Sequence, residues 1–266
     1  MPEGDTVFQA AARLQAALAG NALTRCDIRV PRYAGVDLTG RVVDEVLARG
    51  KHILIRLGDS TIHAHLKMEG VWFVASRDTR WPRPTHQARI ILESGSSVAV
   101  GFALGKLEVI RHADEVGVVG HLGPDLLGPD WDAERAEANL RARPDRPIGH
   151  ALLDQGNLAG IGNVYRCELC FIHRTHPATQ VGDVADLAAW IASARSLLVA
   201  NRDRVSRVTT GVDRPGRRLW VYGRARRACL RCGTAIRAGR LGGQGEHDRS
   251  VFWCPICQPE PACQMP

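Results

Sequence analysis

The chain begins with Met1-Pro2-Glu3, a start that could carry out covalent chemistry once the methionine is removed. Trimming before proline would leave Pro2 with a free secondary amine, a nucleophile that can attack a sugar C1′ and form an iminium ion. A generic α-amino group has a pKa of roughly 7.8, against about 10.4 for lysine, so more of it is unprotonated near neutral pH. Glu3 could donate a proton to the departing group. Many unrelated proteins also begin Met-Pro, so this motif needs support from the rest of the chain.

Four cysteines near the end of the chain have the spacing of a metal site. Cys229 and Cys232 form one pair and Cys254 and Cys257 another, with 21 residues between the pairs. Each pair can supply two thiolates from one turn, and the gap is just beyond the ~15 to 20 residues usual in four-cysteine zinc sites. A segment this small needs a metal to stay folded. The sequence therefore predicts one structural Zn²⁺, because four thiolates leave no open position for catalysis.

Basic charge is concentrated in the second half of the chain. Residues 1–130 contain 15 Lys and Arg and 15 Asp and Glu, whereas residues 131–266 contain 20 and 13, which is the whole net charge of +7. Residues 201–240 hold twelve arginines and two aspartates, a local charge of +10. Such a stretch favours a polyanion such as nucleic acid, although a solvated basic surface would have the same composition.

The elements that must position these groups differ between the two halves. Apolar residues recur at spacings of four, three and four from Val7 to Leu18, which predicts an amphipathic helix over 5–19. Short β-branched runs separated by Gly, Pro and Asp then predict an antiparallel sandwich or barrel. These runs cover 27–30, 42–47, 52–57, 61–65, 71–74, 89–93, 98–101 and 107–110.

After residue 130 the pattern becomes helical. Helices are predicted over 131–142, 147–154, 163–171 and 185–200. Cys167 and Cys170 fall within one of them, on one face, and are expected to be small buried residues, with a second metal site as a distant alternative. The acidic start of the chain and the lack of a run of ~20 apolar residues predict a cytoplasmic protein rather than a secreted or membrane one.

Taken together, the motifs resemble those of the formamidopyrimidine-DNA glycosylase and endonuclease VIII family. The resemblance covers essentially the whole chain, and the expected branch is bacterial, actinobacterial endonuclease VIII. Five motifs and the four-cysteine hairpin occur in the family's order. The five are Met1-Pro2-Glu3-Gly4-Asp5-Thr6, Arg49-Gly50-Lys51-His52, His65-Leu66-Lys67-Met68-Glu69-Gly70, Leu122-Gly123-Pro124-Asp125 and Gly160-Ile161-Gly162-Asn163-Val164-Tyr165.

This resemblance implies an α+β multidomain fold. Residues 1–125 are expected to form a catalytic β-sandwich domain with a leading helix, and residues 130–222 a helix-two-turns-helix DNA-binding domain. Residues 223–258 are expected to form a zinc-finger hairpin. The implied partner is damaged DNA, bound by a monomer that needs no membrane and no nucleotide cofactor and that associates with the nucleoid when bound.

The resemblance also assigns roles to single residues. Lys51 would assist base loss and β-elimination, and Met68 would insert where the target base leaves the stack. Asn163 would belong to a phosphate clamp, and Arg249 would support δ-elimination by holding phosphates. Taken alone, the first three have ordinary alternatives: Lys51 as a surface hairpin lysine, Met68 as a core methionine and the Asn163 segment as a helix-to-helix turn.

The implied activity is that of a bifunctional DNA glycosylase and abasic-site lyase that forms a Schiff base on Pro2 and proceeds by β,δ-elimination. Thr6 stands where the purine-specific branch usually has glutamate, which favours oxidised pyrimidines. The Leu66-Lys67-Met68 segment is closer to the purine branch, so a glycosylase for 8-oxoguanine or formamidopyrimidine lesions is an alternative. Two alternatives come from other classes of protein. A zinc-ribbon DNA-binding protein without activity would leave Pro2, Glu3 and Lys51 without a role. A proline tautomerase would leave the arginines and cysteines without one.

Overall fold

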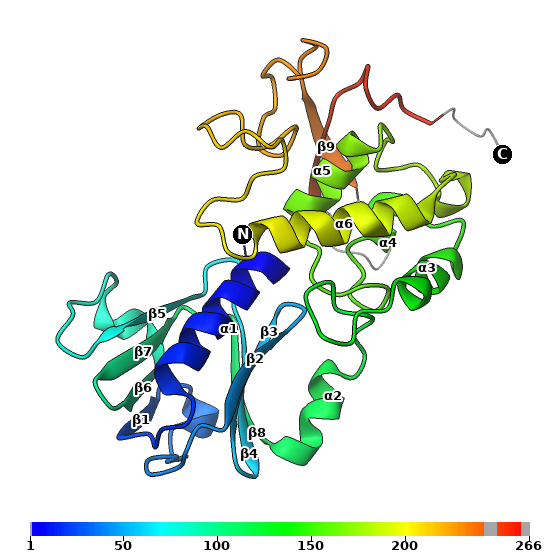
Figure 1. Ribbon diagram of the computed structural model, residues 1–266. Helices are drawn as coiled ribbons and strands as arrows, with labels where there is room; N and C mark the ends of the chain where they lie inside the picture. The colour runs from blue at the N-terminus through cyan, green and yellow to red at the C-terminus, as the bar shows by residue number, and fades with distance from the viewer. Residues whose placement is uncertain (1, 242–248, 262–266) are drawn as a thin grey trace. The chain divides into compact units, whose positions relative to one another are not determined.

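The computed structural model describes residues 2–241 and 249–261. The chain forms two compact units, Met1–His121 and Leu122–Pro266 (Figure 1). The expected domain limits at 125, 130, 222 and 258 remain predictions. Among the described residues, no helix has both the length and the hydropathy that a membrane span requires.

The first unit is a β-sandwich that begins with one helix, α1 (Gly4–Leu18). Its two antiparallel sheets have the strand orders β1-β6-β7-β5 and β2-β3-β4-β8. The first sheet comprises β1 (Arg25–Ile28), β5 (Val71–Ser76), β6 (Ala88–Ser94) and β7 (Ser97–Phe102), and the second comprises β2 (Glu45–Arg49), β3 (His52–Leu57), β4 (Ser60–His65) and β8 (Lys106–Arg111). All eight predicted strands are present, and the predicted fold class is confirmed.

Helix α1 is part of the core of this sandwich. Val7, Leu14 and Leu18 are buried in one cluster with residues of both sheets, among them Ile55 of β3 and Leu92 of β6. The spacing of these apolar residues places them on one face of the helix. The helix ends at Leu18 because Ala19 is extended and Gly20 adopts a left-handed conformation, φ 78°.

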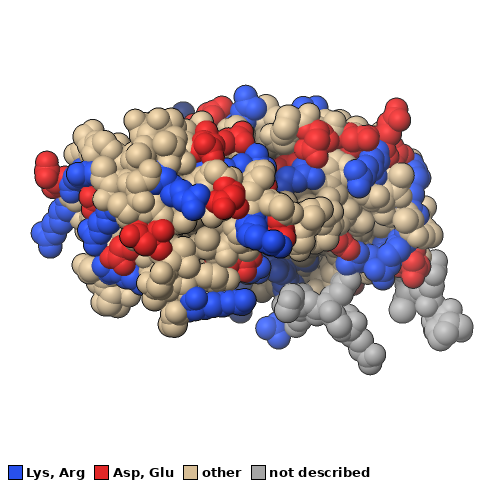
Figure 2. Space-filling model, turned by 90° about the horizontal axis from the view of Figure 1, so that it is seen from below, with Lys and Arg blue, Asp and Glu red and all other residues tan. Residues whose placement is uncertain are grey.

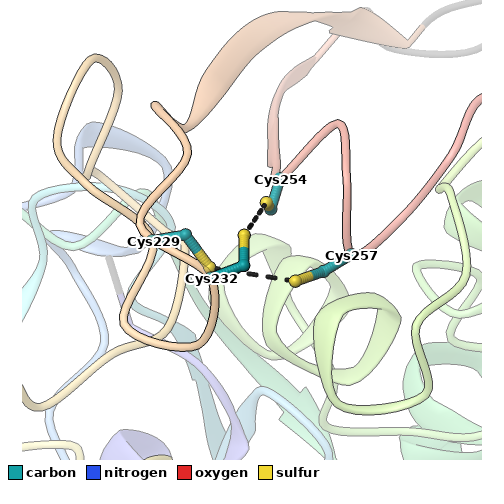
Figure 3. Close-up of side chains that lie close together, drawn as sticks. All are labelled: Cys229, Cys232, Cys254 and Cys257. Carbon is teal, nitrogen blue, oxygen red and sulfur yellow. Dashed lines mark hydrogen bonds between the residues drawn. The ribbon is translucent and has the colours of Figure 1, made fainter.

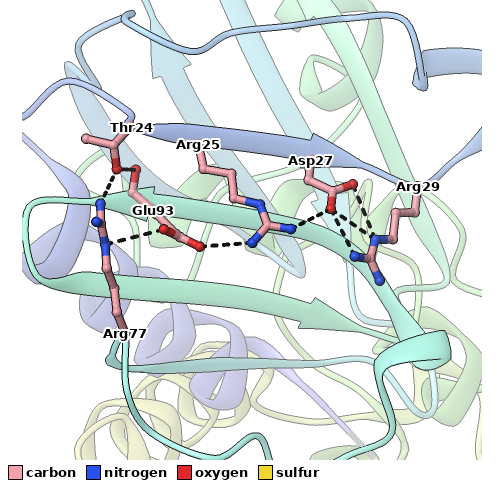
Figure 4. Close-up of polar contacts among 6 residues, drawn as sticks. All are labelled: Thr24, Arg25, Asp27, Arg29, Arg77 and Glu93. Carbon is pink, nitrogen blue, oxygen red and sulfur yellow. Dashed lines mark hydrogen bonds and ion pairs between the residues drawn. The ribbon is translucent and has the colours of Figure 1, made fainter.

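Strand β1 lies at one edge of the first sheet, where unpaired backbone groups could recruit another strand. Its outer side chains carry an ionic network instead (Figure 4). Arg25 bonds to both Asp27 and Glu93, and Arg29 bonds to Asp27 at 2.9 Å. These exposed pairs contribute little to stability, but charge on an edge strand disfavours pairing between molecules.

A short helix that the sequence did not predict, α2 (Glu115–Val119), lies close to the end of the first unit. It is attached through Glu115, whose carboxylate accepts hydrogen bonds from Arg56 and from Thr61 at 2.6 Å. A helix of five residues is too short to show apolar periodicity, and this one depends on tertiary contacts.

The second unit is helical and ends in a hairpin. Asp132 and Asp186 cap two of its helices by accepting backbone N–H groups at the third residue beyond. The helices bury a common core that includes Tyr165, Leu169 and Trp190. Its elements are α3 (Ala133–Arg141), α4 (Ile148–Ala151), α5 (Asn163–Ile172), α6 (Leu187–Asn201), β9 (Arg237–Leu241) and β10 (Arg249–Trp253).

The core packing of α1 gives a stability prediction. Replacing the fully buried Leu14 with alanine should lower the free energy of unfolding by about 2 to 5 kcal/mol, since it leaves a cavity between the sheets. Val116, which is 74% exposed on α2, is the control, and Val116→Ala should change it by less than about 0.5 kcal/mol. Urea denaturation followed by circular dichroism measures both. Equal effects of the two variants would show that α1 is not a core element.

Candidate active site and metal centre

Pro2 and Glu3 lie directly before the first turn of α1. Pro2 is half-buried, and the Glu3 side chain is fully buried. The Glu3 carbonyl accepts the Val7 N–H at 3.0 Å, but its carboxylate does not cap the helix. The buried carboxyl group of Glu3 therefore lies next to Pro2 in the chain and does not serve as the helix cap.

Lys51 lies at the tip of a two-residue turn between β2 and β3. Arg49 pairs with His52 across this hairpin, and Gly50 has φ 57°. A positive φ at the first central position is what a tight hairpin turn of this kind requires, and glycine adopts it without strain. The backbone at Lys51 is therefore fixed by the turn and by the strand that follows.

Met68 lies in the turn after β4 and is 63% exposed. The core position that an isolated methionine would favour is therefore wrong for this residue. The turn closes through Gly70 N–H to Leu66 C=O at 3.0 Å, and Lys67 has a left-handed backbone, φ 53°. Because His52 and His65 are register partners, the turns carrying Lys51 and Met68 lie at the same end of the second sheet.

Four imidazoles cluster at this end of the sheet, which the sequence did not indicate. The Nδ1 of His52 lies 2.7 Å from the Nε2 of His63, and the rings of His65 and His121 approach His52 edge-on. Burial, helped by neighbouring imidazoles and lysines, lowers the pKa of His52 to about 3 and that of His65 to about 4. His52 and His65 are consequently neutral at physiological pH.

In the second unit, the start of α5 is connected to the finger hairpin. Asn163 is buried, and its Nδ2 donates to the Ser250 carbonyl at 2.9 Å. Arg166, which is fully buried, donates to the same carbonyl at 3.0 Å and to the Asn163 side chain. Asn163 therefore holds β10 in this structure, and its predicted part in a phosphate clamp remains a prediction.

A buried carboxylate that the sequence did not single out organises the arginine-rich segment. Glu168 of α5 accepts backbone N–H groups from Trp220, Val221 and Tyr222 at 2.7 to 2.9 Å, and it also accepts the Thr209 hydroxyl. Burial raises the pKa of Glu168, whereas these four donors favour the charged form. A glutamate in a helix is usually a surface residue, so nothing in the sequence indicated that Glu168 binds the backbone of this segment.

The four predicted metal ligands come together (Figure 3). Their sulfur atoms all lie within 4.8 Å of one another, with Cys232 and Cys254 at 3.4 Å and Cys229 and Cys257 at 4.0 Å. A Zn–S bond of about 2.3 Å in a tetrahedron gives sulfur separations of roughly 3.8 Å, so the donor set fits Zn²⁺. The predicted zinc finger is consistent with this geometry.

Helix α5 carries two further cysteines, neither of which joins the metal cluster. Cys167 and Cys170 are fully buried, as expected, and burial raises the pKa of Cys167 to about 11. Cys167 packs with Phe171 against Cys229 and Cys254. The Arg231 guanidinium covers Phe171 at 4.3 Å from the ring centroid. Cys167 therefore serves as apolar packing beneath the finger, whereas Cys170 packs into the helical core.

Many arginines of the second unit are exposed. Arg249 begins β10, and its guanidinium has no ion-pair partner among residues 2–241 and 249–261. Eight arginines between residues 201 and 240 are exposed: Arg204, Arg214, Arg217, Arg226, Arg227, Arg231, Arg237 and Arg240. On the face shown in Figure 2, basic and acidic side chains are interspersed. The basic excess thus belongs to exposed side chains.

Comparisons with known families agree with this arrangement. The formamidopyrimidine-DNA glycosylase N-terminal domain model matches residues 1–101, and the helix-two-turns-helix domain model of the same glycosylase matches residues 122–194. The chain belongs to the formamidopyrimidine-DNA glycosylase family. The family expected from the sequence is confirmed, and so is the class of enzyme, a DNA glycosylase whose relatives include a lyase.

Two relatives of this glycosylase illustrate the match. Probable endonuclease 8 2 of Streptomyces coelicolor is 57% identical over 266 residues, covering 98% of this chain and 95% of that protein. DNA-(apurinic or apyrimidinic site) lyase Nei2 of Mycolicibacterium smegmatis is 53% identical, covering 97% and 99%. A Lactococcus lactis formamidopyrimidine-DNA glycosylase, crystallised with abasic-site DNA, has a TM-score of 0.78 and 22% identity, covering 97% of this chain and 100% of that one. It shows the same fold.

The cysteine geometry gives a metal prediction. The purified protein should contain about one zinc ion per chain, and Cys257→Ser should reduce the zinc content and loosen the finger, because one ligand is lost. Cys26→Ser is the matched control, since Cys26 lies in β1 outside the cluster. Elemental analysis measures the zinc content, and proteolysis at the hairpin measures the loosening. Zinc content unchanged by Cys257→Ser would contradict the site.

The imidazole cluster gives a pH prediction. The folded-state pKa values of His52 and His65 lie below the unfolded value of about 6.5. As the pH falls below about 6.5, the unfolded chain therefore binds more protons than the folded chain. The free energy of unfolding should therefore decrease from about pH 6.5 towards pH 4, and His52→Asn should make that decrease shallower. Urea denaturation at constant ionic strength measures the slope. His86→Asn removes an exposed imidazole outside the cluster and is the control; an equal change with both variants would contradict the prediction.

Proposed function

We propose that this chain is a bifunctional DNA glycosylase and abasic-site lyase that removes oxidised bases, with pyrimidines preferred, in base excision repair. The observation that carries the proposal is the start of the chain: Pro2 directly precedes a helix locked into the core, and the carboxyl group of Glu3 is buried beside it. The names of the relatives, an endonuclease 8 and an abasic-site lyase, support the same activity.

The proposed reaction begins with the damaged base rotated out of the stack. The unprotonated nitrogen of Pro2 attacks the sugar C1′, and the bond from C1′ to the base breaks. The ring bond from C1′ to O4′ then breaks, and Glu3 supplies a proton to the ring oxygen or to the departing base. The proton that the Pro2 nitrogen loses goes to the other of these two. The product is an iminium ion between Pro2 and C1′. This step requires removal of Met1, which lies outside the described residues.

The iminium ion then acts as an electron sink for strand cleavage. Loss of a proton from C2′ expels the 3′-phosphate by β-elimination, and a further elimination expels the 5′-phosphate. Lys51, on its tight hairpin, assists base loss and the first elimination. Arg249 holds phosphate during the second, for which a guanidinium is suited by its paired donors. Hydrolysis of the remaining imine releases Pro2.

DNA binding in this proposal combines a wedge with a basic surface. Met68, exposed at the tip of its turn, enters the gap left by the flipped base and offsets part of an unstacking cost of a few kcal/mol. Asn163 lies at the N-terminal end of α5, where a helix favours an anion such as phosphate. The exposed arginines of the second unit neutralise further phosphates.

Lesion preference and cellular setting are also part of the proposal. Thr6 in place of a glutamate, together with the endonuclease 8 names of relatives, favours oxidised pyrimidines. The resemblance of the Leu66-Lys67-Met68 segment to the purine branch favours a second candidate, a purine-lesion glycosylase. Zn²⁺ is structural, since the four cysteines would complete its coordination. The enzyme acts as a monomer in the cytoplasm, at the nucleoid.

Borohydride trapping tests the proposed chemistry. Methionine-trimmed protein should form a covalent adduct at Pro2 with duplex DNA carrying an oxidised pyrimidine, and should form less with 8-oxoguanine. Pro2→Gly should lose strand cutting and keep DNA binding. Glu3→Gln should slow base release at least about 100-fold, because a general acid contributes roughly 10²- to 10⁴-fold. Peptide mass spectrometry locates the adduct, and gel electrophoresis follows cleavage.

Glu134→Gln is the control for Glu3→Gln, since it neutralises an exposed acid on α3 and should leave the rate unchanged. Stronger trapping on 8-oxoguanine would support the purine-lesion candidate instead. Protein that binds both duplexes but traps on neither, or traps through a lysine, would show that Pro2 is not the nucleophile. A zinc-ribbon DNA-binding protein without activity would then be the better description.

A further inference from the structure

Three hydrogen-bonded side chains cross the second sheet of the first unit, from β8 through β4 to β3. The Nδ1 of His63 lies 2.8 Å from a carboxylate oxygen of Glu108, and its Nε2 lies 2.7 Å from the Nδ1 of His52. His63 is fully buried, and Glu108 is its register partner on β8. Lys106 also bonds to Glu108, at 2.9 Å.

The donor and acceptor groups of these three side chains allow only one arrangement of their protons, which is called the proton order below. A carboxylate only accepts hydrogen bonds, so the Nδ1 of His63 must carry the proton that it donates to Glu108. A neutral imidazole has one N–H, so the Nε2 of His63 accepts, and the Nδ1 of His52 must donate to it. The Nε2 of His52 is consequently left without a proton.

The charge states required by this order are the ones that the environment favours. Burial lowers the pKa of both His52 and His63, which keeps the two rings neutral. Burial opposes ionisation of Glu108, but the hydrogen bonds from Lys106 and His63 lower its pKa overall. The other groups that act on these rings are His65 of β4, His121 and, on α2, Glu115.

The chain of hydrogen bonds ends where two functional turns begin. His52 directly follows Lys51, and its register partner is His65, whose ring it meets edge-on at 4.9 Å. The Nδ1 of His65 accepts the Lys67 N–H at 2.9 Å, which fixes the start of the turn that carries Met68. The orientation of His52 thus bears on the backbone of both turns.

We propose that Glu108, His63 and His52 are positioning residues for the reaction, because their single order of protons holds the turns of Lys51 and Met68 in place. The inference rests on the proposed function, since it is there that Lys51 and Met68 act on DNA. None of the three residues touches the reacting atoms. Their effect reaches the substrate through the two turns.

The first experiment changes Glu108, the carboxylate acceptor that determines the proton order. Glu108→Gln should let both tautomers of His63 occur, because an amide group can donate as well as accept. Single-turnover cleavage should then be about 10-fold slower, with DNA affinity within about 2-fold, since small misplacements of reacting groups have effects of this size or larger. The control is Glu45→Gln on β2 of the same sheet. It removes the ion pair between Glu45 and Arg56 of β3 and should leave the rate unchanged.

A second pair of variants keeps the inference testable if Glu108→Gln fails to fold. His52→Asn preserves a donor near the position of Nδ1, whereas His52→Leu removes it. His52→Leu should slow cleavage about as much as Glu108→Gln, and His52→Asn should recover most of the rate. Equal rates for His52→Asn and His52→Leu, or equal effects of Glu108→Gln and Glu45→Gln, would overturn the inference.

A measurement that needs no DNA separates this inference from the proposed function. Long-range ¹H–¹⁵N spectra of the unmodified protein should show His52 and His63 as Nδ1–H tautomers at neutral pH, and His63 as a mixture in Glu108→Gln. An Nε2–H tautomer of His63 in the unmodified protein would overturn the proton order. If the predicted tautomers are present but no adduct forms at Pro2, it is the proposed function that fails.

Discussion

The burial of α1 is the constraint on which the proposed chemistry of this molecule depends. Chain termini usually fray, and a nucleophile on a mobile end would be poorly placed. Here Val7, Leu14 and Leu18 lock the helix between two sheets, so the residue two positions before its first turn has a fixed location. In the proposed mechanism the sandwich therefore supports the amine of Pro2, and its strand ends supply the turns that carry Lys51 and Met68.

In the second unit, a segment that is rich in arginine and poor in apolar residues is held in one conformation by contacts with the rest of the unit. Such a segment cannot bury enough surface to fold by itself. Glu168 holds three consecutive backbone N–H groups of it, Asn163 and Arg166 hold β10, and the four cysteines gather the finger. A buried carboxylate that lost its donors would be strongly destabilising, so these anchors specify one arrangement of the segment.

The sequence predicted the elements with strong periodicity or punctuation, including α1, the eight strands and the cysteine hairpin. It failed where the signal lies in tertiary contacts. Helix α2 is too short to show a period and depends on Glu115. The core alternative for Met68 was wrong, because exposure on a turn leaves no mark in composition. Glu108 and His63 are 45 residues apart, and only their register on β4 and β8 brings them together.

The uneven distribution of charge separates binding from chemistry. Contacts to phosphate act over a wide surface and weaken with salt, so they suit the exposed arginines of the second unit. Residues 1–121 of the first unit contain 15 Lys and Arg and 13 Asp and Glu, a net charge of only +2, and burial keeps His52 and His65 neutral. In the proposed function, attraction to DNA there comes from Lys51 and Lys67, which lie on turns, and hydrogen bonds that salt hardly screens fix the positions of those turns. Affinity and turnover would then vary independently.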